Sequence, residues 1–434
     1  MSARGRRIAA IVIAGMALAS LAGVRATPPS ERGHGPLPQQ AYLWQRHWDN
    51  EVRFALDRSR NALDGLVVLA AEVAWEGAVP RATRVAFEAD RLQRRDAPVG
   101  LAVRIRTFPG KPSAYRHAAV PLGLIVEDIL RDARAHGLIV AELQIDYDAP
   151  EAHLAAYRLW VRRLRALACR TPLVITALPC WLDHDAFVPL VQAADGYVLQ
   201  VHALQRPHTP EGPFVLCDPD SARARVEQAG ALGIPFRIAL PTYGYAVLRD
   251  ASGRFMGLSA ETLSFRRPAS DRLTLVQADP AAMQALAAGW QRSRPRALEG
   301  ILWYRLPVEG DRLNWPWSTF QAVRSGRPLR TDAVVIATQP EAGLVELAWR
   351  NRGNLPVALD RPVAVTWEGG TLLAGDGSAD YRAPDLACAP GTTRFRPVAS
   401  GPLAALAPGD HRPVGWLRFD GKVTVHVAAE VPHP

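Results

Sequence analysis

Two aspartates follow a short apolar stretch near the middle of the first 300 residues, where Leu143–Asp148 has the sequence LQIDYD. On a β-strand, residues two positions apart point to the same side and lie about 7 Å apart. Asp146 and Asp148 are therefore expected to project together. Two carboxylates this close disfavour each other's ionisation, and such pairs occur at catalytic and wet sites. The alternative for a single aspartate here is to cap the helix that follows.

Eight short apolar stretches around this pair predict β-strands. They are Ala41–Arg46, Leu66–Val73, Leu101–Thr107, Ile139–Asp146, Leu173–Leu178, Gly196–His202, Phe236–Pro241 and Gly300–Leu306. Apolar residues at helical spacing predict helices between them, at Leu122–His136, His153–Ala168, Ser221–Leu232 and Pro280–Arg292. The crossover at Val85–Gln93 looks more strand-like than helical, and the helix after the fifth strand is short. This alternation predicts an α/β fold, a TIM-type (β/α)8 barrel with irregularities, over residues 40–325.

Two further regions depart from the barrel pattern. Residues 243–280 form an insertion after the seventh strand, with a turn at Asp250–Gly253 that indicates a small β excursion. Residues 332–434 contain short β-rich runs separated by Gly, Pro, Asn and Asp, which predicts a β-sandwich-like domain. Packing against the barrel is its expected role. Carbohydrate binding through Trp349, Trp367 or Trp416 is the alternative.

Active sites of such barrels lie at the C-terminal ends of the strands, and polar and aromatic residues gather there in this sequence. We expect Asp148, Asp146 and Glu72 to be catalytic, and Gln144, Trp44, Trp181, Gln200, His202, Tyr243, Trp303 and Arg106 to bind substrate. Aromatic faces beside carboxylates suit sugar rings. Each residue has a structural alternative: the tryptophans as core, and His202 as a satisfied buried histidine. Arg104 and Arg106 would either clamp an anionic substrate or neutralise the acidic groups.

The first 39 residues predict export. Residues 1–26 combine three early arginines with an apolar run from Ile8 to Gly23 and small residues at Val24 and Ala26, as in a bacterial signal peptide. Residues 27–39 are rich in Pro and Gly and predict a linker. The run of 16 residues is short for a membrane span, which needs about 20. We expect a periplasmic or secreted protein with no stable membrane span after cleavage; an inner-membrane anchor by an uncleaved signal is the lesser alternative.

Composition narrows the remaining classes. The formal charge of +9 falls to +5 without the four arginines of residues 1–26, and no basic run is interleaved with aromatics, so we expect no nucleic-acid partner. Lys111 and Lys422 are the only lysines among 51 basic residues, which indicates genome composition. The four cysteines have no zinc-type spacing, and either one bridge among Cys169, Cys180 and Cys217 or free thiols fit an exported chain. We expect no metal and no cofactor.

The segments AYLWQR, LAAE, LQIDYD, ITALP-x-WL, LQVH and ALPTYG together resemble an uncharacterised family of exported bacterial proteins, domain of unknown function 3142, over residues 40–320. The family has no established activity, so the resemblance implies the fold and export. A more distant similarity is to chitinase-like barrels of glycoside hydrolase family 18, which carry D-x-D-x-E at the end of the fourth strand. That resemblance implies that Asp148 stands where the general acid would be and Asp146 where the substrate's acetamido group is steered. Tyr243 resembles, in its position after a barrel strand, the tyrosine that assists catalysis in those family 18 barrels.

This sequence departs from the D-x-D-x-E pattern in two places: Gln144 replaces the first Asp, and the shorter Asp148 replaces Glu. The leading hypothesis is an exported glycoside hydrolase acting on a polysaccharide or oligosaccharide through Asp148, with Asp146 or Glu72 as the second carboxylate. A non-catalytic glycan-binding protein on a degenerate barrel is the alternative. A metal-dependent hydrolase using Asp146, Asp148 and His202 is a third, unsupported by any metal motif.

Overall fold

The computed structural model describes residues 32–168, 170–202, 214–260, 271–378, 380–384, 391–398 and 405–429. The predicted signal peptide, the first part of the linker, Cys169 and Cys388 lie outside these ranges. Cys180 and Cys217 are free thiols. Within the described ranges, none of the helices combines the length and apolar character that crossing a membrane requires.

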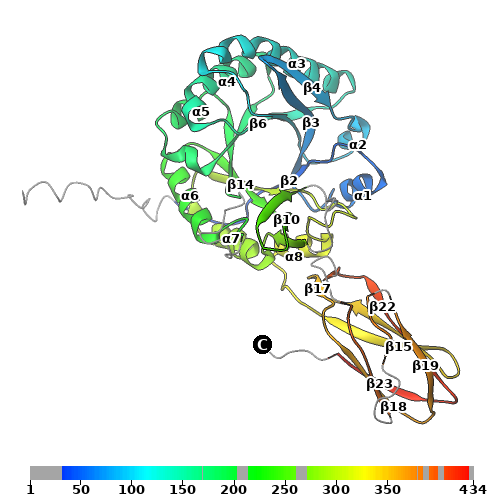
Figure 1. The fold of residues 1–434 in the computed structure, drawn as a ribbon. Coiled ribbons are helices and arrows are strands. Elements are labelled where there is room, and N and C mark those ends of the chain that lie inside the picture. Colours follow the sequence, from blue (N-terminus) through cyan, green and yellow to red (C-terminus); the bar gives the residue numbers. More distant parts are fainter. Residues whose placement is uncertain are drawn as a thin grey trace, which may run out of the picture.

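Eight parallel strands close into a barrel, which Figure 1 shows end-on with helices around it. In order around the barrel they are β2 (Gln39–Leu43), β3 (Gly65–Glu76), β5 (Val99–Ile105), β6 (Val140–Tyr147), β7 (Leu173–Ala177), β8 (Gly196–Gln200), β9 (Phe236–Pro241) and β14 (Leu298–Tyr304). β14 pairs with β2, and β2 pairs with β3, so the sheet has no gap. The predicted TIM-type barrel is therefore confirmed, and each predicted strand overlaps an observed one.

A helix follows each strand of the barrel. These are α1 (Asn50–Arg58), α2 (Ala89–Gln93), α3 (Tyr115–Ala135), α4 (Leu154–Ala168), α5 (Phe187–Val191), α6 (Pro219–Ala231), α7 (Pro280–Arg292) and α8 (Trp317–Ser325). Short 3-10 turns occur at Pro112–Ala114, Glu151–His153 and Pro179–Asp183. The aspartates that precede α1, α6 and α7 each accept a hydrogen bond from a first-turn N–H, which fixes where those helices begin.

The strand-like reading of Val85–Gln93 was wrong. The strand in this crossover is β4 (Val79–Arg84), which folds back antiparallel on the long end of β3. The chain then forms the short helix α2, where Glu88 and Arg91 are one turn apart and form an ion pair with Nε–Oε2 of 3.0 Å. The apolar residues at 85 and 87 belong to the irregular link between the two elements.

The region after β9 forms a small sheet of its own. β10 (Gly244–Arg249) pairs with both β11 (Phe255–Ser259) and β12 (Arg272–Gln277), all antiparallel. Asp250 closes the turn between β10 and β11 by accepting hydrogen bonds from the backbone N–H groups of Ser252 and Arg254. At the opposite end of the barrel, the short strands β1 (Arg32–Gly33) and β13 (Arg294–Pro295) pair. The sheet of β10–β12 lies beyond the C-terminal end of β9, which is the end where a barrel binds its substrate.

The C-terminal strands form a separate β body, visible beside the barrel in Figure 1. One sheet contains β15 (Ala333–Glu341), β16 (Leu344–Asn351), β22 (His411–Phe419) and β19 (Leu372–Gly377). The other contains β20 (Thr392–Phe395), β18 (Val363–Glu368) and β23 (Thr424–Ala429), and β17 (Val357–Ala358) pairs with β21 (Ala405–Leu406). Its core is separate from that of the barrel. The predicted β-sandwich-like domain fits this arrangement.

The tryptophans of this domain differ in exposure. Trp349 is buried and donates a hydrogen bond from Nε1 to the hydroxyl of Tyr381 at 2.8 Å. Trp367 is partly buried and packs on Phe419, a residue of the core. Trp416 is 39% exposed. Trp416 is the most exposed of the three, and it lines a cavity of about 560 Å³ together with Trp349.

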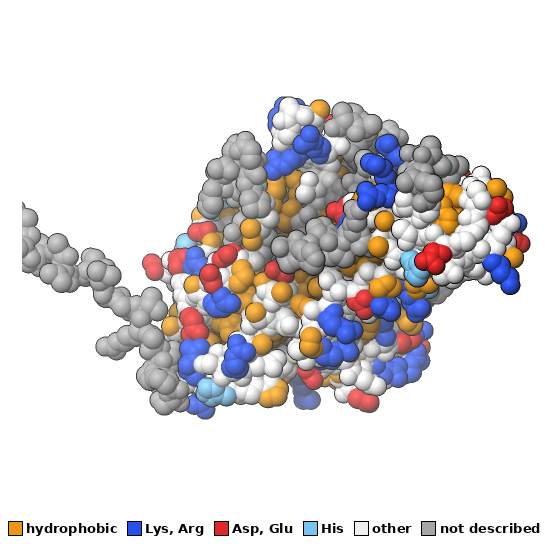
Figure 2. Space-filling model, turned by 90° about the horizontal axis from the view of Figure 1, so that it is seen from below, with side chains coloured by type: hydrophobic (Ala, Val, Ile, Leu, Met, Phe, Trp, Pro, Cys, Tyr) orange, Lys and Arg blue, Asp and Glu red, His pale blue; other side chains and the backbone are white. Residues whose placement is uncertain are grey.

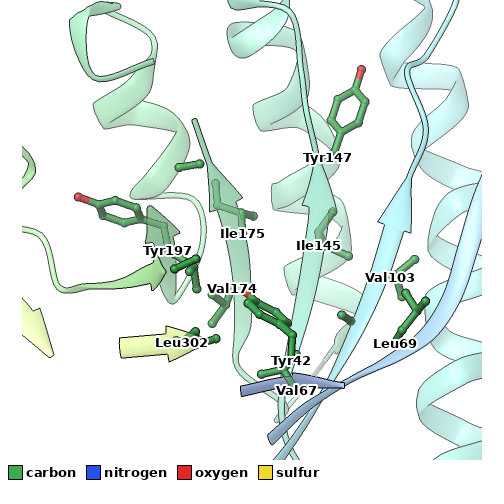
Figure 3. Close-up of a cluster of buried hydrophobic side chains, with 14 of the residues drawn as sticks. Tyr42, Val67, Leu69, Val103, Ile145, Tyr147, Val174, Ile175, Tyr197 and Leu302 are labelled. Carbon is green, nitrogen blue, oxygen red and sulfur yellow. The ribbon is translucent and has the colours of Figure 1, made fainter. Parts of the chain in front are cut away.

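The outer core of the barrel is apolar and aromatic. Side chains from successive strands pack under the helices. Figure 3 shows part of the buried apolar set of the barrel, together with the inward-facing Tyr42. Trp160 on α4 is fully buried, stacks on Tyr115 at 4.5 Å and donates a hydrogen bond to the carbonyl of Tyr115. On the face in Figure 2, basic and acidic side chains are interspersed with apolar ones over the described surface.

The inside of the barrel is polar along β6. Glu142 forms an ion pair with Arg237 on β9, with Oε2–Nη2 of 2.7 Å, and accepts a hydrogen bond from Gln144 at 2.7 Å. The hydroxyl of Tyr42 donates to Gln144 at 2.7 Å. A Cβ at Gly100 would lie 2.8 Å from Cγ of Glu142, so this position on β5 must lack a side chain. The even-numbered residues of β6 thus form a connected polar column below the C-terminal end of the barrel.

Breaking the lowest pair of this column should destabilise the barrel. Glu142→Ala leaves the Arg237 guanidinium without its carboxylate, and we expect the free energy of unfolding in urea to fall by about 2 kcal/mol. This is less than the ~3–5 kcal/mol lost from a fully buried pair because both side chains keep some exposure.

Glu299→Ala, on an exposed position of β14, is the matched control and should change stability by at most about 0.5 kcal/mol. Replacing both partners, with Glu142→Gln and Arg237→Gln, should recover part of the loss. Equal stability of the Glu142→Ala and Glu299→Ala proteins would show that the pair does not support the barrel.

Candidate active site

A cavity of about 540 Å³ opens at the C-terminal ends of the strands. Its walls combine two carboxylates, two guanidinium groups, a histidine and several aromatic rings. The lining residues are Tyr42, Trp44, Arg104, Asp146, Asp148, Thr176, Leu178, Gln200, His202, Ala239, Tyr243, Tyr245, Leu258, Ser259, Ala260, Tyr304 and Arg305. They come from seven of the eight barrel strands or the residues just after them, and from the inserted sheet. This is the end of the barrel where catalytic groups are expected.

Asp146 lies deep in the cavity and is held by neighbouring strands. Its Oδ1 accepts a hydrogen bond from the hydroxyl of Thr176 on β7 at 2.9 Å and another from the amide of Gln200 on β8 at 3.1 Å. Burial raises the pKa of Asp146, while the nearby Arg104 charge and these two hydrogen bonds act against the rise. Two donors on one oxygen fix the carboxylate in place.

Asp148 lies two residues further, at the mouth of the same cavity. Its side chain is exposed to solvent, but protein atoms surround the carboxylate on the other sides. This burial and then the charge of Asp146 raise the pKa of Asp148 to about 6, against the opposing effect of Arg104. Among the described residues, nothing donates a hydrogen bond to it. Asp148 can therefore take up and release a proton near neutral pH.

Aromatic rings and a neutral histidine form the opposite wall. The ring of His202 stacks on that of Tyr304 with centroids 5.4 Å apart, and its Nδ1 lies 3.5 Å from the hydroxyl of Tyr243. Burial lowers the pKa of His202 to about 4, so the ring is uncharged at neutral pH. Trp44 packs edge-on against Tyr304 at 5.4 Å. Nε1 of Trp44 and Nε2 of His202 are buried without a hydrogen-bond partner among the described residues, so a ligand hydroxyl in the cavity could satisfy them.

Glu72, Arg104 and Asp146 lie side by side on three adjacent parallel strands, because their Cα atoms are in register. Glu72 is engaged by Arg46, with Nε–Oε2 of 2.6 Å and Nη2–Oε1 of 2.9 Å. This bidentate contact lowers the pKa of Glu72, even though partial burial opposes it. Glu72 therefore stays anionic outside the cavity lining, and Arg104 separates it from Asp146.

The inserted sheet covers one side of the cavity. Residues 258–260, at the end of β11, contribute to the lining. Arg305 donates to the carbonyl of Ala260 at 3.1 Å and to Oδ2 of Asp311 at 2.7 Å. The largely buried ion pair with Asp311 holds the Arg305 side chain in place, and the hydrogen bond from Arg305 to Ala260 ties the inserted sheet to the end of β14.

The structure brings together six of the eleven residues expected at the site. Asp146, Asp148, Trp44, Gln200, His202 and Tyr243 line the cavity, whereas Glu72, Gln144, Arg106, Trp181 and Trp303 do not. Gln144 faces the barrel interior one layer below.

Three of the remaining residues point elsewhere for simple reasons. Trp303 alternates with the inward Tyr304 and packs under α8 with Phe320. Trp181 is buried against Tyr157 on α4. Arg106 lies beyond the end of β5 and is exposed, so the strand alternation no longer holds its side chain inside.

Sequence reasoning missed Tyr42, Thr176 and residues 258–260. Tyr42 and Thr176 carried a usable signal, because each lies two positions before a residue at a strand end, Trp44 and Leu178, and two-residue alternation gives them the same direction. Residues 258–260 carried no such signal. Among the described residues, no group of three or more His, Cys, Asp or Glu side chains is arranged to hold a metal ion.

Residues 115–309 match the family model of a domain of unknown function, DUF3142. No curated protein sequence matches the chain. Among solved structures, the spore cortex-lytic enzyme SleL of Bacillus cereus is similar, with 13% identity, a TM-score of 0.49 and coverage of 68% of this chain and 75% of that one.

A chitinase from Chromobacterium violaceum has 14% identity, a TM-score of 0.45 and coverage of 67% and 98%. A class V chitinase from Nicotiana tobaccum has 13% identity, a TM-score of 0.43 and coverage of 68% and 99%. Both resemblances expected from the sequence are thus found. At these identities and TM-scores, the likeness carries no argument about the activity of this chain.

The ionisation of Asp148 should respond to its two charged neighbours in opposite directions. Asp146→Asn removes a negative charge and should lower the pKa of Asp148, whereas Arg104→Gln removes a positive charge and should raise it. The ¹³C shift of the Asp148 carboxyl, followed from pH 3 to pH 8, measures both changes. A midpoint that stays at about 6 in both variants would show that the three groups do not interact.

Proposed function

We propose that this protein is an exported glycoside hydrolase that cleaves a glycan in the cavity above β6. The observation that carries the proposal is the position of Asp148, a carboxyl with a pKa raised to about 6, at the open side of an aromatic-walled cavity and beside a fixed second carboxylate. Sugar rings stack on aromatic side chains through their C–H faces, and their hydroxyls need polar partners such as Trp44 Nε1 and His202 Nε2.

Asp148 has the properties of a general acid. In its protonated form it donates a proton to the glycosidic oxygen as the bond to the anomeric carbon breaks. The carboxylate then accepts a proton from the water that adds to that carbon, which returns Asp148 to its starting state. A pKa near the operating pH favours both halves of this cycle. The open position of Asp148 gives the leaving group and the water access to it.

Asp146 is the second carboxylate of this proposal. It lies on the same side of β6, and Thr176 and Gln200 hold it in one orientation. In one mechanism, the negative charge of Asp146 stabilises the positive charge that develops at the anomeric carbon. In the other, the substrate is an N-acetyl sugar whose own acetamido group attacks the anomeric carbon, and Asp146 orients that group. Glu72 is less suited to this role because Arg46 occupies both its oxygens and Arg104 lies between it and the cavity.

A non-catalytic glycan-binding protein is the second candidate, and the hydrogen bonds of Gln144 favour it. Gln144 occupies the first position of the Gln-x-Asp-x-Asp pattern, accepts a hydrogen bond from Tyr42 and donates one to Glu142. Both bonds run away from Asp146, so the acid pair lacks support from this position. The two candidates differ in whether Asp148 is needed for turnover or only for the shape of the cavity.

Export belongs to the proposal because residues 1–26 have the charge and apolar pattern of a signal peptide. N-terminal sequencing of the protein from the cell envelope should then begin at Thr27. Recovery of the intact N-terminus in the membrane fraction would show an uncleaved anchor.

Replacing the acid should abolish turnover and leave the fold intact. We expect Asp148→Asn to reduce the release of products from bacterial exopolysaccharides and cell-wall glycans by about 10²–10⁴-fold, because the amide cannot donate the proton. Mass spectrometry of the released oligosaccharides measures this loss. Wild-type activity should fall as the pH rises above about 6, since Asp148 then loses its proton.

Asp185→Asn is the matched control, because Asp185 lies in the loop after β7, is exposed and does not line the cavity. Its activity should equal that of wild type. Retained turnover in Asp148→Asn would show that Asp148 is not the general acid. Binding without turnover in wild type and Asp148→Asn alike would establish the glycan-binding alternative.

The second carboxylate is tested by a pair of variants. We expect Asp146→Asn to lose about 10²-fold or more in kcat, and Glu72→Gln to keep activity within about tenfold of wild type. Initial rates at saturating glycan measure both. The reverse order of the two losses would make Glu72 the catalytic partner and contradict the role given to Asp146.

A further inference from the structure

Arg104 differs from the other arginines of the barrel interior and rim. Arg237 holds Glu142, Arg46 holds Glu72, and Arg305 holds Asp311, each at 2.6–2.7 Å. Arg104 is half-buried, lines the cavity, and forms no hydrogen bond or ion pair among the described residues. Asp146 and Asp148 act on it through their fields, but neither has an oxygen within 4.0 Å of its guanidinium nitrogens.

A half-buried guanidinium without a direct partner is unusual. It carries five N–H donors in a planar fork that matches a carboxylate in two parallel hydrogen bonds, and removing it from water is costly unless such bonds replace hydration. Asp146 does not supply these bonds, because neither of its oxygens lies within 4.0 Å of the guanidinium nitrogens, and its Oδ1 accepts from Thr176 and Gln200 instead. No other group among the described residues occupies the donors of Arg104, so they are available to a molecule in the cavity.

We propose that Arg104 binds the carboxylate of an acidic sugar, so that the glycan taken into this cavity carries uronic acid or a similar carboxylated residue. The inference rests on the proposed function for the cleavage step, but the binding step stands without it. Arg104 lies beside Asp146 in the register of β5 and β6, so an acidic sugar on Arg104 lies next to the reacting carboxylates. The neutral aromatic wall of Trp44, Tyr304 and His202 stacks the ring while Arg104 fixes its charged end.

Arg104 has one competing role, as the counter-charge that keeps Asp146 and Asp148 ionisable. That role predicts that Arg104→Gln shifts the pH dependence of activity and leaves the choice between charged and neutral sugars unchanged. The proposal predicts a change in that choice. The two roles are therefore separated by comparing ligands that differ only in the carboxyl group.

The experiment uses oligosaccharides of galacturonate, of mannuronate and of alternating glucuronate and N-acetylglucosamine, each paired with its carboxyl-reduced form. Binding to the full mature chain carrying Asp148→Asn is measured by calorimetry, so that turnover does not interfere. We expect at least one acidic ligand to bind about 10–100-fold more tightly than its reduced form, as hydrogen bonds to a charged group allow.

Adding Arg104→Gln to Asp148→Asn should remove this preference and leave the affinity for the reduced form within about threefold. Arg104→Lys, which keeps the charge but not the planar fork, should retain part of the preference. Thermal unfolding of each variant shows that the fold is kept, and the Lys variant keeps the test informative if the Gln variant unfolds. Equal affinity for acidic and reduced ligands, no binding of any acidic ligand, or a preference that survives Arg104→Gln would overturn the inference.

The outcomes also separate this inference from the proposed function. Hydrolysis of acidic and reduced glycans at equal rates by wild type would overturn the role of Arg104 and leave the hydrolase. Arg104-dependent binding of an acidic glycan that no preparation cleaves would support the role of Arg104 and overturn the hydrolase.

Discussion

The two-residue alternation of β6 inside a closed barrel is the constraint on which this site depends. Because the barrel has no open edge, every second side chain of β6 must point into the interior, and here these are Glu142, Gln144 and Asp146. Asp148, one residue beyond the strand, continues this row at the cavity. Polar groups in that interior need partners. The first three find them in Arg237, Tyr42, Thr176 and Gln200, whereas Asp148 at the mouth accepts no hydrogen bond among the described residues. The polar side chains of this row therefore have fewer hydrogen-bond partners among the described residues as the row approaches the solvent.

This gradient explains the electrostatics of the cavity. Burial raises the pKa of Asp148, and the charge of the well-bonded, fixed Asp146 raises it further, to about 6. Arg104, the next residue across the sheet, acts against the rise without contacting either carboxylate. Asp148, which titrates near neutral pH, and Arg104, whose donors have no partner in the described part of the chain, both line the same cavity. Water or a ligand must complete the bonding of both.

The fold could be predicted from the sequence because each barrel strand is a short apolar run and most are separated by an amphipathic helix. The direction of Asp146 could be predicted as well, since alternation holds within a strand. Past a strand end the alternation is no longer a guide: Asp148, one residue beyond β6, still lines the cavity, whereas Arg106, one residue beyond β5, does not. Residue type also did not show which of two adjacent strand residues points into the barrel. Trp303 was predicted as a site residue, but Tyr304 faces the cavity and Trp303 packs under α8.

Tertiary contacts limited the prediction elsewhere. The sequence places Glu72 at a strand end beside the acid pair, but nothing in it indicates that Arg46, from another strand end, occupies both its oxygens. The lining residues 258–260 come from the inserted sheet, whose position over the barrel depends on the Arg305–Asp311 pair and its contact with Ala260. Contacts between residues this far apart in the sequence leave no mark in the local pattern of residue types.

The ionisation of Asp148, measured beside the activity, decides whether this carboxyl is the general acid. The carboxyl pKa from ¹³C titration of the free protein is compared with the pH dependence of kcat/KM on the glycan that is cleaved fastest. The account predicts that the loss of activity at rising pH has its midpoint at the Asp148 pKa, about 6, and that both values fall together in Asp146→Asn. Activity that does not follow the Asp148 titration, or that persists when Asp148 is replaced by Asn, would contradict it.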